Sequence, residues 1–309
     1  MSVDVVIVNW NSGSLIVDCL NSLLDCGDEI SNIILVDNAS TDGSYELIVK
    51  NYRNVIFVSN KKNFGFAKAC NIGAALAQNE YILFLNPDTK VFRGSISKSL
   101  FFMQQPENYS IGAVGIKLRD GTGKVARSSC RFPAISSLVC HSVGLDRLLP
   151  RTGYLMNDWD HMDSRNVDHV IGAFYLIRRR IFEKLNGFDE RFFVYLEDLD
   201  LSLRIRNLGY KVFYLSEAEA YHVGGGTSSR VKALRLFYSL RSRLIYANKH
   251  FPPLGRVPIF AATLFVEPFI RIFSSALNLK FLESVEAIKG FWNLYRWMPS
   301  LFKKNNESL

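Results

Sequence analysis

The sequence is poor in the features that mark disulfide-stapled or zinc-clustered domains. Its five cysteines are odd in number, and no two of them form a C-x-x-C motif. Such a set indicates neither a disulfide framework nor a zinc knuckle. We therefore expect reduced thiols, as in a protein of the cytosol. A signal peptide is not expected either, because the first predicted strand begins at residue 3.

Two glycine-rich signatures of nucleotide binding are also absent. No G-x-G-x-x-G follows the first predicted strand, which disfavours a nicotinamide or flavin site, and no Gly-Lys-Ser/Thr P-loop occurs. Residues 9–14 contain no Lys or Arg. A nucleotidyltransferase would need a basic, glycine-rich triphosphate loop in that region, so this class of enzyme is disfavoured.

Acidic residues are scarce in the last quarter of the chain. The whole chain has 37 Lys and Arg against 29 Asp and Glu, and residues 230–309 hold 13 of the former and 4 of the latter. Subtraction leaves 24 against 25 for residues 1–229. The basic excess is therefore an appendage on a neutral, enzyme-sized region. A nucleic-acid binder is more often basic around its reading surface, so no nucleic-acid partner is expected.

Apolar runs alternate with helical segments through the first part of the chain. Strands are predicted at 3–8, 33–36, 55–59 and 81–85. Helices are predicted at 15–24, after residue 44 to about residue 52, and at 67–77. Farther on we predict helices at 95–104, at 179–185, and after residue 195 up to residue 206. Strands are predicted at 111–118, 170–178 and 211–215, whereas residues 119–168 show no clear helical or strand periodicity. The alternation is typical of an α/β, Rossmann-like, mostly parallel sheet with helices on both faces.

Polar residues follow each of the first four predicted strands. They are Asn9 and Asn11, then Asp37, Asn38 and Asp42, then Asn63, Gly65 and Lys68, and finally Asn86 and Asp88. Ligands of parallel sheets bind at the carboxyl ends of the strands, where an Asp can accept hydrogen bonds from a base or ribose. Two plainer interpretations stay open: Asp88 as part of a polar turn, and Ser40 to Asp42 as a cap of the next helix.

Two further groups of residues have the chemistry of a site. Glu197, Asp198 and Asp200 are three carboxylates within four residues, and Arg204 lies one helical turn after Asp200. One carboxylate is a candidate general base, although a solvated helix start and an Asp200–Arg204 pair are also compatible with the pattern. His222 precedes the glycine run 224–226. A lone His is more often structural, yet it is also the commonest metal ligand.

The basic C-terminal region combines helical periodicity with aromatic residues that lie beside Lys and Arg in the sequence. An amphipathic helix is predicted at 234–246, and 257–277 is almost entirely apolar but contains Glu267 and Arg271. Residues 281–302 place Trp and Tyr beside Lys and Arg. This composition suits a helix at a membrane surface, and equally a helical cap packed on the preceding domain; both can hold together.

In their order and spacing, these motifs resemble the family 2, GT-A-type inverting glycosyltransferases, and within them the bacterial rhamnosyltransferase-like branch. The resemblance covers roughly residues 3–229. It rests on Val36-Asp37-Asn38-Ala39-Ser40, Asn63-Phe64-Gly65-Phe66-Ala67, Leu85-Asn86-Pro87-Asp88-Thr89, Gly172-Ala173-Phe174, Gly187-Phe188-Asp189-Glu190-Arg191, Glu197-Asp198-Leu199-Asp200 with Arg204, and His222 with Gly224. Related branches transfer galactofuranose or other sugars.

The resemblance implies a role for each matching residue. Asp198 would be the catalytic base, with Glu197, Asp200 and Arg204 beside it. Asp88, at the family's D-x-D signature, and His222 would bind a divalent cation, Mg²⁺ or Mn²⁺. The nucleotide-sugar donor would be bound by Asn9, Asn11, Asp37, Asn38, Asp42, Asn63, Gly65, Lys68, Asn86, Gly172 and Ala173. Asn86 replaces the first acid of D-x-D, as is common in this branch, so tight metal binding without the donor is not expected.

The resemblance also implies the substrates and the organisation of the chain. The expected donor is dTDP-β-L-rhamnose, with galactofuranose, glucose or GlcNAc donors as alternatives. The acceptor is expected to be a saccharide, possibly polyprenyl-diphosphate-linked, at the inner face of the cytoplasmic membrane. Residues 1–229 would form the GT-A domain, with a nucleotide-binding half at 1–118 and an acceptor half at 119–229, and 230–309 the membrane-associating helical region. A glycosidase or a non-catalytic nucleotide-sugar-binding protein is the different-class alternative.

Overall fold

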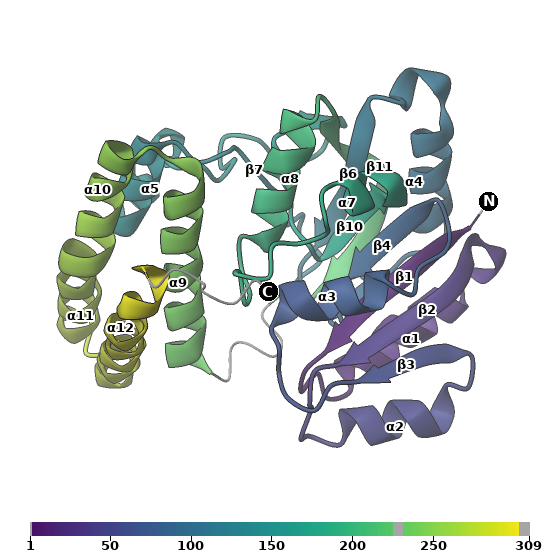
Figure 1. Ribbon diagram of the computed structural model, residues 1–309, viewed down its shortest axis with the longest axis horizontal. Helices are drawn as coiled ribbons and strands as arrows, with labels where there is room; N and C mark the ends of the chain where they lie inside the picture. The colour runs from purple at the N-terminus through teal and green to yellow at the C-terminus, as the bar shows by residue number, and fades with distance from the viewer. Residues whose placement is uncertain (1, 225–230, 303–309) are drawn as a thin grey trace. The chain divides into compact units, whose positions relative to one another are not determined.

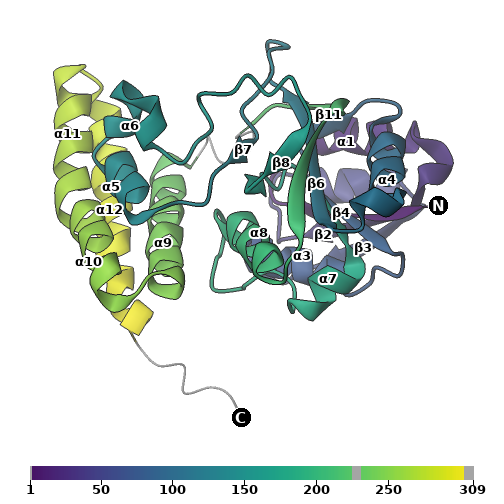
Figure 2. The ribbon, with the colours of Figure 1, turned by 90° about the horizontal axis from the view of Figure 1, so that it is seen from above.

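The computed structural model describes residues 2–224 and 231–302. The chain divides into two compact units (Figures 1 and 2). The sheet unit comprises residues 1–132, 155–193 and 197–227, and the helical unit comprises residues 133–154, 194–196 and 228–309. The boundary expected at 229 and 230 falls outside the described residues. Residues 133–154 belong to the helical unit, and not to the acceptor half in which the sequence placed them.

A mixed sheet forms the centre of the sheet unit. Its strands are β3 (Val55–Ser59), β2 (Ile30–Asp37), β1 (Val3–Asn9), β4 (Tyr81–Leu85), β10 (Phe174–Arg178), β6 (Ile111–Arg119), β11 (Lys211–His222) and β5 (Thr89–Val91) in spatial order, with β8 (Arg165–Val167) also paired to β11. The first four are parallel. β10 runs antiparallel to both β4 and β6. The expected mostly parallel sheet is thus parallel only in part, because a strand's apolar run does not encode its direction.

Helices cover both faces of this sheet, as the alternating strand residues require. Val5 and Ile7 point to the face covered by α1 (Leu15–Leu24), α2 (Ser44–Asn51) and α4 (Ser95–Gln104). Val6 and Val8 point to the face covered by α3 (Phe66–Ala74), α7 (Arg179–Lys184) and α8 (Glu197–Asn207). Figure 2 shows α1 and α4 on one side of the sheet, with α3, α7 and α8 on the other. The predicted two-faced layering is confirmed.

In the described part of the chain, two further short strands lie in the sheet unit, and three 3₁₀ turns occur, the last of them in the helical unit. β7 (Ser129–Cys130) pairs with β9 (His169–Val170) in a separate sheet. The 3₁₀ turns are Gly27–Glu29, Pro106–Asn108 and Pro150–Thr152. β7, β8 and the helices between them lie in the stretch 119–168, where the sequence showed no clean period. β11 is longer than the predicted strand 211–215 because it continues through an irregularity between Leu215 and Glu219 to His222.

The helical unit has its own apolar core. Its helices are α5 (Ile135–Ser142), α6 (Leu145–Leu148), α9 (Lys232–His250), α10 (Pro253–Ala261), α11 (Glu267–Leu277) and α12 (Phe281–Phe302), with a π-helical turn at Ala262–Val266. Leu240 and Leu244 of α9 pack against Phe291 and Leu294 of α12. The continuous helix 253–277 is long and apolar enough to cross a membrane, and 28% of its apolar window is buried. A core helix meets the same test, so this is weak support for membrane association.

Candidate active site

The register of the parallel strands places the first two polar strand ends side by side. Asn9 lies opposite Asp37, and its Nδ2 donates to Asp37 Oδ1 at 2.8 Å and to Ser44 Oγ at 3.0 Å. The backbone N–H of Ser40 donates to Asp37 Oδ2 at 3.0 Å. Asp37 is only 2% exposed. Asn9 Oδ1 is buried and has no hydrogen-bond partner in the described part of the chain, which leaves an acceptor available at this edge.

Asn38 organises the loop after β3. Its Nδ2 donates to Asn63 Oδ1 at 2.9 Å and to the Gly65 carbonyl at 3.1 Å, while its Oδ1 accepts from the Phe64 N–H at 3.1 Å. Gly65 has a φ of +90°, and a Cβ added there would lie 2.4 Å from the Phe193 carbonyl oxygen. Only glycine fits this position. The loop with Asn63 and Gly65 is therefore fixed against the end of β2, as the motif requires.

Asp42 and Asn11 fix the loops that follow β1 and β2. Asp42 Oδ2 accepts from the Gly13 N–H at 2.8 Å, and its Oδ1 accepts from the Ser44 N–H at 3.1 Å. Partial burial opposes ionisation of Asp42, but hydrogen bonds from Ser44 and Gly13 outweigh it and lower the pKa. Asn11 Oδ1 accepts from the Thr41 N–H at 2.7 Å. Asp42 thus holds the first turn of α2, which agrees with the capping interpretation for this residue.

The turn after β4 brings Asp88 to His222. β5 pairs antiparallel with the end of β11, and Thr89 lies opposite His222. His222 Nε2 lies 3.2 Å from Asp88 Oδ1, and both side chains are mostly buried. Within residues 2–224 and 231–302, no group of three or more His, Cys, Asp or Glu side chains is arranged so that it could hold a metal ion. The pair offers one carboxylate and one imidazole, a donor set that fits Mg²⁺ or Mn²⁺ completed by outside oxygen ligands.

The two residues just before β10, Gly172 and Ala173, connect this turn to the acidic cluster. The Ala173 carbonyl accepts from the Asn86 N–H and from Thr89 Oγ1, both at 3.2 Å. The Gly172 N–H donates to Asp198 Oδ2 at 2.7 Å. A Cβ on residue 172 would lie 3.4 Å from the same oxygen. Residues 172 and 173 therefore hold the Asp88 turn on one side and Asp198 on the other.

Asp198 and Glu197 differ sharply in their surroundings. Asp198 Oδ1 accepts from the Leu199 N–H at 2.8 Å, and 16% of the side chain is exposed. Glu197 is 4% exposed, and its Oε2 has no hydrogen-bond partner in the described part of the chain. Burial, and next the charge of Asp198, raise the pKa of Glu197 well above its usual range. Glu197 therefore favours the protonated form, and Asp198 is the more exposed of the two carboxylates.

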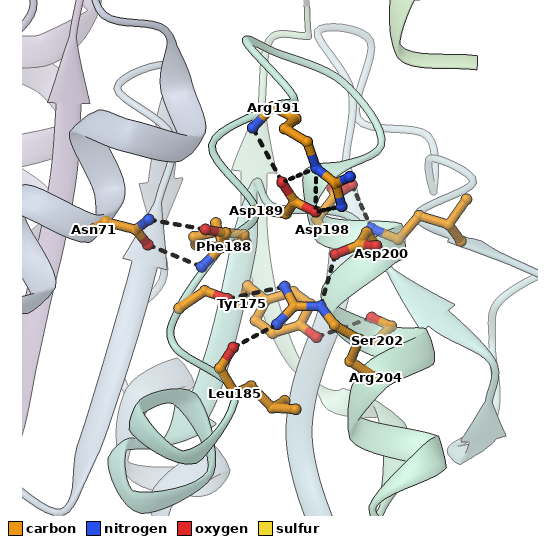
Figure 3. Close-up of polar contacts among 12 residues, drawn as sticks. Asn71, Tyr175, Leu185, Phe188, Asp189, Arg191, Asp198, Asp200, Ser202 and Arg204 are labelled. Carbon is orange, nitrogen blue, oxygen red and sulfur yellow. Dashed lines mark hydrogen bonds and ion pairs between the residues drawn. The ribbon is translucent and has the colours of Figure 1, made fainter. Parts of the chain in front are cut away.

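Asp200 and Arg204 are engaged with each other and with a neighbouring loop (Figure 3). Arg204 Nε donates to Asp200 Oδ2 at 2.7 Å. Its Nη1 and Nη2 donate to the carbonyl oxygens of Leu185 and Gly187 at 2.8 and 2.9 Å. The i,i+4 pair that the sequence allowed is present. These contacts fix the turn after α7 in place beside α8.

Lys68 points to the segment after α7. It forms a half-exposed ion pair with Glu190 at 2.9 Å. Asn71, one turn farther along α3, donates to the Phe188 carbonyl at 2.9 Å and accepts from its N–H at 2.9 Å (Figure 3). Lys68 is therefore tied to Glu190 in this structure. Of the glycine run after His222, only Gly224 is described, and residues 225–229 lie outside the described part of the chain.

His169 is a neighbour of Asp198 that the sequence did not single out. It lies on β9, and its Nε2 is 3.8 Å from Asp198 Oδ2. No periodic or motif signal marks this position, because β9 has only two residues and Asp198 lies on α8, far along the chain. The pairing of β9 with β7 and the packing of α8 create the contact.

The polar loops after the parallel strands, the Asp88–His222 pair and the partly exposed Asp198 fit an enzyme that transfers a group from a nucleotide-bound donor. The comparison with known families agrees: residues 4–186 match "Glycosyl transferase family 2". The chain therefore belongs to glycosyl transferase family 2.

Two relatives refine this placement. The chain is 30% identical over 264 residues to the N-acetylglucosaminyl-diphospho-decaprenol L-rhamnosyltransferase of Mycobacterium tuberculosis, with 80% of this chain and 84% of the relative covered. It is 27% identical over 250 residues to rhamnosyltransferase WbbL of Escherichia coli, with 76% and 91% covered. The predicted resemblance to the rhamnosyltransferase-like branch is confirmed.

Among solved structures, the mannosyltransferase PcManGT from Pyrobaculum calidifontis, in complex with GDP-Man and Mn²⁺, is similar with a TM-score of 0.55 and 15% identity, over 95% of this chain and 86% of that one. Staphylococcus aureus TarS 1–349 is similar with a TM-score of 0.52 and 16% identity, over 97% and 91%. At these identities the likeness establishes the GT-A-like fold.

Proposed function

We propose that this protein transfers L-rhamnose from dTDP-β-L-rhamnose to a hydroxyl of a lipid-linked saccharide in the synthesis of a cell-surface polysaccharide. The observation that carries this proposal is the extensive similarity to a rhamnosyltransferase whose name specifies a diphospho-decaprenol acceptor. The site supports the reaction type, because residues 172 and 173 join the Asp88 turn to Asp198. Donor and acceptor chemistry can therefore meet at one strand end.

Asp198 is the proposed base. Its carboxylate accepts the proton of the acceptor hydroxyl while that oxygen bonds to the anomeric carbon and the bond to the nucleoside diphosphate breaks. With one base and no protein nucleophile, the single displacement inverts the configuration and gives an α-rhamnoside. The strand-end loops with Asp37, Asn38 and Asn63 bind and orient the nucleotide.

Asp88 and His222 are the proposed protein ligands of a divalent cation. When bound there, Mg²⁺ or Mn²⁺ would supply positive charge against the leaving diphosphate. Because Asp88 and His222 would supply only two ligands, the remaining ligands would have to come from oxygen atoms outside the protein, such as those of the donor's phosphates. We therefore expect metal and donor to bind together.

The helical unit is the proposed membrane-associating part. Phe265, Phe269, Phe273 and Leu277 form an exposed stripe at four-residue spacing, which places them on one face of a helix. Leu279, Phe281, Leu282, Val285, Ile288 and Trp292 continue the exposed apolar surface through the turn into α12. Lys280 and Lys289 are exposed in the same segment.

An anionic lipid surface fits this combination of apolar stripe and basic charge, at the inner face of the cytoplasmic membrane. A polyprenyl-linked acceptor is held at such a surface. The proposed location therefore brings the enzyme to its acceptor without requiring that the helix 253–277 span the bilayer.

A donor screen tests the proposed function. Release of nucleoside diphosphate is measured for dTDP-rhamnose and for galactofuranose, glucose and GlcNAc donors, with and without Mg²⁺ or Mn²⁺, in the presence of a lipid-linked GlcNAc-diphosphate acceptor. We expect acceptor-dependent release of dTDP with the rhamnose donor and metal. A faster reaction with another donor would replace rhamnose in the proposal. Donor binding without turnover for every donor would favour a non-catalytic nucleotide-sugar-binding protein.

A further inference from the structure

A buried chain of polar groups leads from the core of the sheet unit to Asp198. His169 is 3% exposed, and Ser202 and Tyr175 are fully buried. His169 Nδ1 lies 3.1 Å from Ser202 Oγ, and Ser202 Oγ lies 2.9 Å from the Tyr175 hydroxyl oxygen, a contact visible in Figure 3. The other ring nitrogen, Nε2, lies 3.8 Å from Asp198 Oδ2.

The direction of the hydrogen bonds follows from counting donors. In the described part of the chain, the Tyr175 hydroxyl contacts only Ser202 Oγ, so its proton has an acceptor only if it donates to Ser202. Ser202 then donates to His169 Nδ1, and the ring proton resides on Nε2, facing Asp198. The opposite direction would leave a buried Tyr175 O–H without an acceptor and would turn the Nε2 lone pair toward a carboxylate. The chain therefore assigns the Nε2–H tautomer to His169.

We propose that His169 is a positioning residue for the base: its Nε2–H, oriented through Ser202 by Tyr175, holds the Asp198 carboxylate in place and favours its ionised form. The inference rests on the proposed role of Asp198. The Gly172 N–H already donates to the same oxygen at 2.7 Å, so His169 would supply a second donor. At 3.8 Å the contact is too long for a hydrogen bond and is electrostatic in this structure; hydrogen bonds of catalytic groups often tighten only in the substrate complex.

The charge state of the ring agrees with this arrangement. Burial lowers the pKa of His169, although Asp198 and Asp168 act in the opposite direction. The ring is therefore neutral and can act as donor at one nitrogen and acceptor at the other. Tautomer control of this kind orients a His against a carboxylate without adding a buried charge.

Other titratable groups face this cluster and bear on any pH profile. They are Asp168, Glu197, Cys70, Cys130, Tyr175 and Arg204. Burial first of all raises the pKa of Cys70, Cys130 and Tyr175, so these groups stay protonated between pH 5 and 8. Asp168 accepts a hydrogen bond from the Phe132 N–H at 2.8 Å. In the test, the Asp198→Asn variant distinguishes the titration of Glu197 from that of Asp198, because only Glu197 still titrates in that variant.

The first test compares two substitutions of His169. The amide of Asn replaces Nδ1 and keeps the contact with Ser202 but has no donor near Asp198, whereas the longer Gln amide reaches the place of Nε2. We expect His169→Asn to lower kcat at least tenfold with donor KM within twofold, and to move the acid limb of kcat to higher pH. His169→Gln should recover most of the loss. Equal kcat and equal acid limbs in the two variants would overturn the proposal.

His161→Asn is the matched control. His161 is also buried, and its Nδ1 contacts the Trp159 carbonyl at 3.1 Å while the ring stacks on Trp159. We expect this variant to lose thermal stability without moving the acid limb of kcat. If His169→Asn and His161→Asn change both quantities alike, His169 is merely structural and the proposal is overturned.

A second readout needs neither donor nor acceptor, so it separates this proposal from the proposed function. The ¹³C signal of the Asp198 carboxyl carbon is assigned by its loss in Asp198→Asn and titrated in the free protein. The midpoint should move to higher pH in His169→Asn, and by less in Ser202→Ala, which interrupts the chain. If His169→Asn does not fold, Ser202→Ala decides, while the midpoint of His169→Gln should stay near the wild-type pH. A midpoint that stays at the wild-type pH in His169→Asn, or in Ser202→Ala if His169→Asn does not fold, would overturn the proposal, even if rhamnose transfer were confirmed.

Discussion

Asp198 has the surroundings of a base that must stay accessible and ionised. Two backbone N–H groups donate to it, one to each oxygen, and Oδ1 keeps a second lone pair for an acceptor hydroxyl. Asn has nearly the same shape as Asp, but its amide group is too weak a base to take the proton of the acceptor hydroxyl. We expect Asp198→Asn to keep donor affinity within about twofold and to lower kcat by about 10²- to 10⁴-fold, the usual contribution of a general base.

Steady-state kinetics and donor calorimetry check this prediction. Glu107→Gln, on the exposed turn Pro106–Asn108, is the matched carboxylate-to-amide control and should have the wild-type rate. Transfer at the parental rate by Asp198→Asn would show that another group takes the proton.

Asp88 should control donor affinity through the metal. The Asp88–His222 pair is too small a ligand set to hold a divalent ion tightly by itself. We expect Asp88→Ala to weaken donor binding at least tenfold in the presence of Mg²⁺ or Mn²⁺, which is about 1.4 kcal/mol. Without metal, the wild type and the variant should bind the donor alike. Calorimetric affinities that do not depend on metal in the wild type would contradict this role.

The pairing of β6 and β11 contains a charged cluster at the irregularity of β11. Glu219 lies opposite Lys117. It pairs with Arg119 at 2.6 Å and with Lys117 at 2.9 Å. The hydrogen bond from Arg119 is the main reason that the pKa of Glu219 falls from 4.5 to about 2. Partial burial raises this pKa by less, and Lys117 lowers it further. The cluster lies where the β6–β11 pairing resumes after the irregularity, three residues before His222.

The depressed pKa of Glu219 fixes the sign of a pH dependence. The stability it contributes is present above the unfolded-state pKa of 4.5 and is lost as the pH falls through about 2. We expect Glu219→Gln to lower the free energy of unfolding by about 1 kcal/mol at pH 7, after allowance for solvent screening, and by less at pH 4. Urea denaturation at the two pH values measures the difference. An equal loss at both would mean that charge is not the cause.

The strands β1, β2 and β4 were predictable because apolar runs, mostly buried on both faces, end in polar residues, and the edge strand β3 keeps a short apolar run although Ile56 is exposed. β10 was recognised as a strand, but its antiparallel direction was not, since an apolar run reads the same in either direction. The short elements of 119–168 were missed for a different reason. Their stability comes from partners distant in sequence, such as β9 for β7 and α10 for α5, and not from local periodicity.

The two units differ in composition as well as structure. The helical unit carries most of the basic excess of the chain and a long exposed apolar surface. Exposed apolar patches often mark surfaces that bind a protein or a membrane, and Lys280 and Lys289 are exposed in the same segment. Each buried Leu would contribute about 1.5–3 kcal/mol to membrane association.

We therefore expect the double variant Leu279→Glu, Leu282→Glu to bind liposomes with 30% anionic lipid at least a hundredfold more weakly than the wild type, at about 1.4 kcal/mol per tenfold. Both leucines are strongly exposed at the turn between α11 and α12. Leu148→Glu, at an equally exposed position on α6, is the control and should bind as the wild type does. Equal sedimentation of the double variant and the wild type with liposomes would reject membrane docking through this surface.

The amino-acid sequence was sufficient for the layered α/β architecture, the family and the loops that follow β1 to β4, because burial on two faces and strand-end polarity are written in local patterns. It was sufficient, too, to place a carboxylate at Asp88 and a candidate base at Asp198. The tertiary structure decided which groups meet. The antiparallel β5–β11 pairing brings His222 to Asp88. The β7–β9 pairing and α8 bring His169 to Asp198. Contacts between segments far apart in the chain depend on sheet order and register, which no local pattern contains.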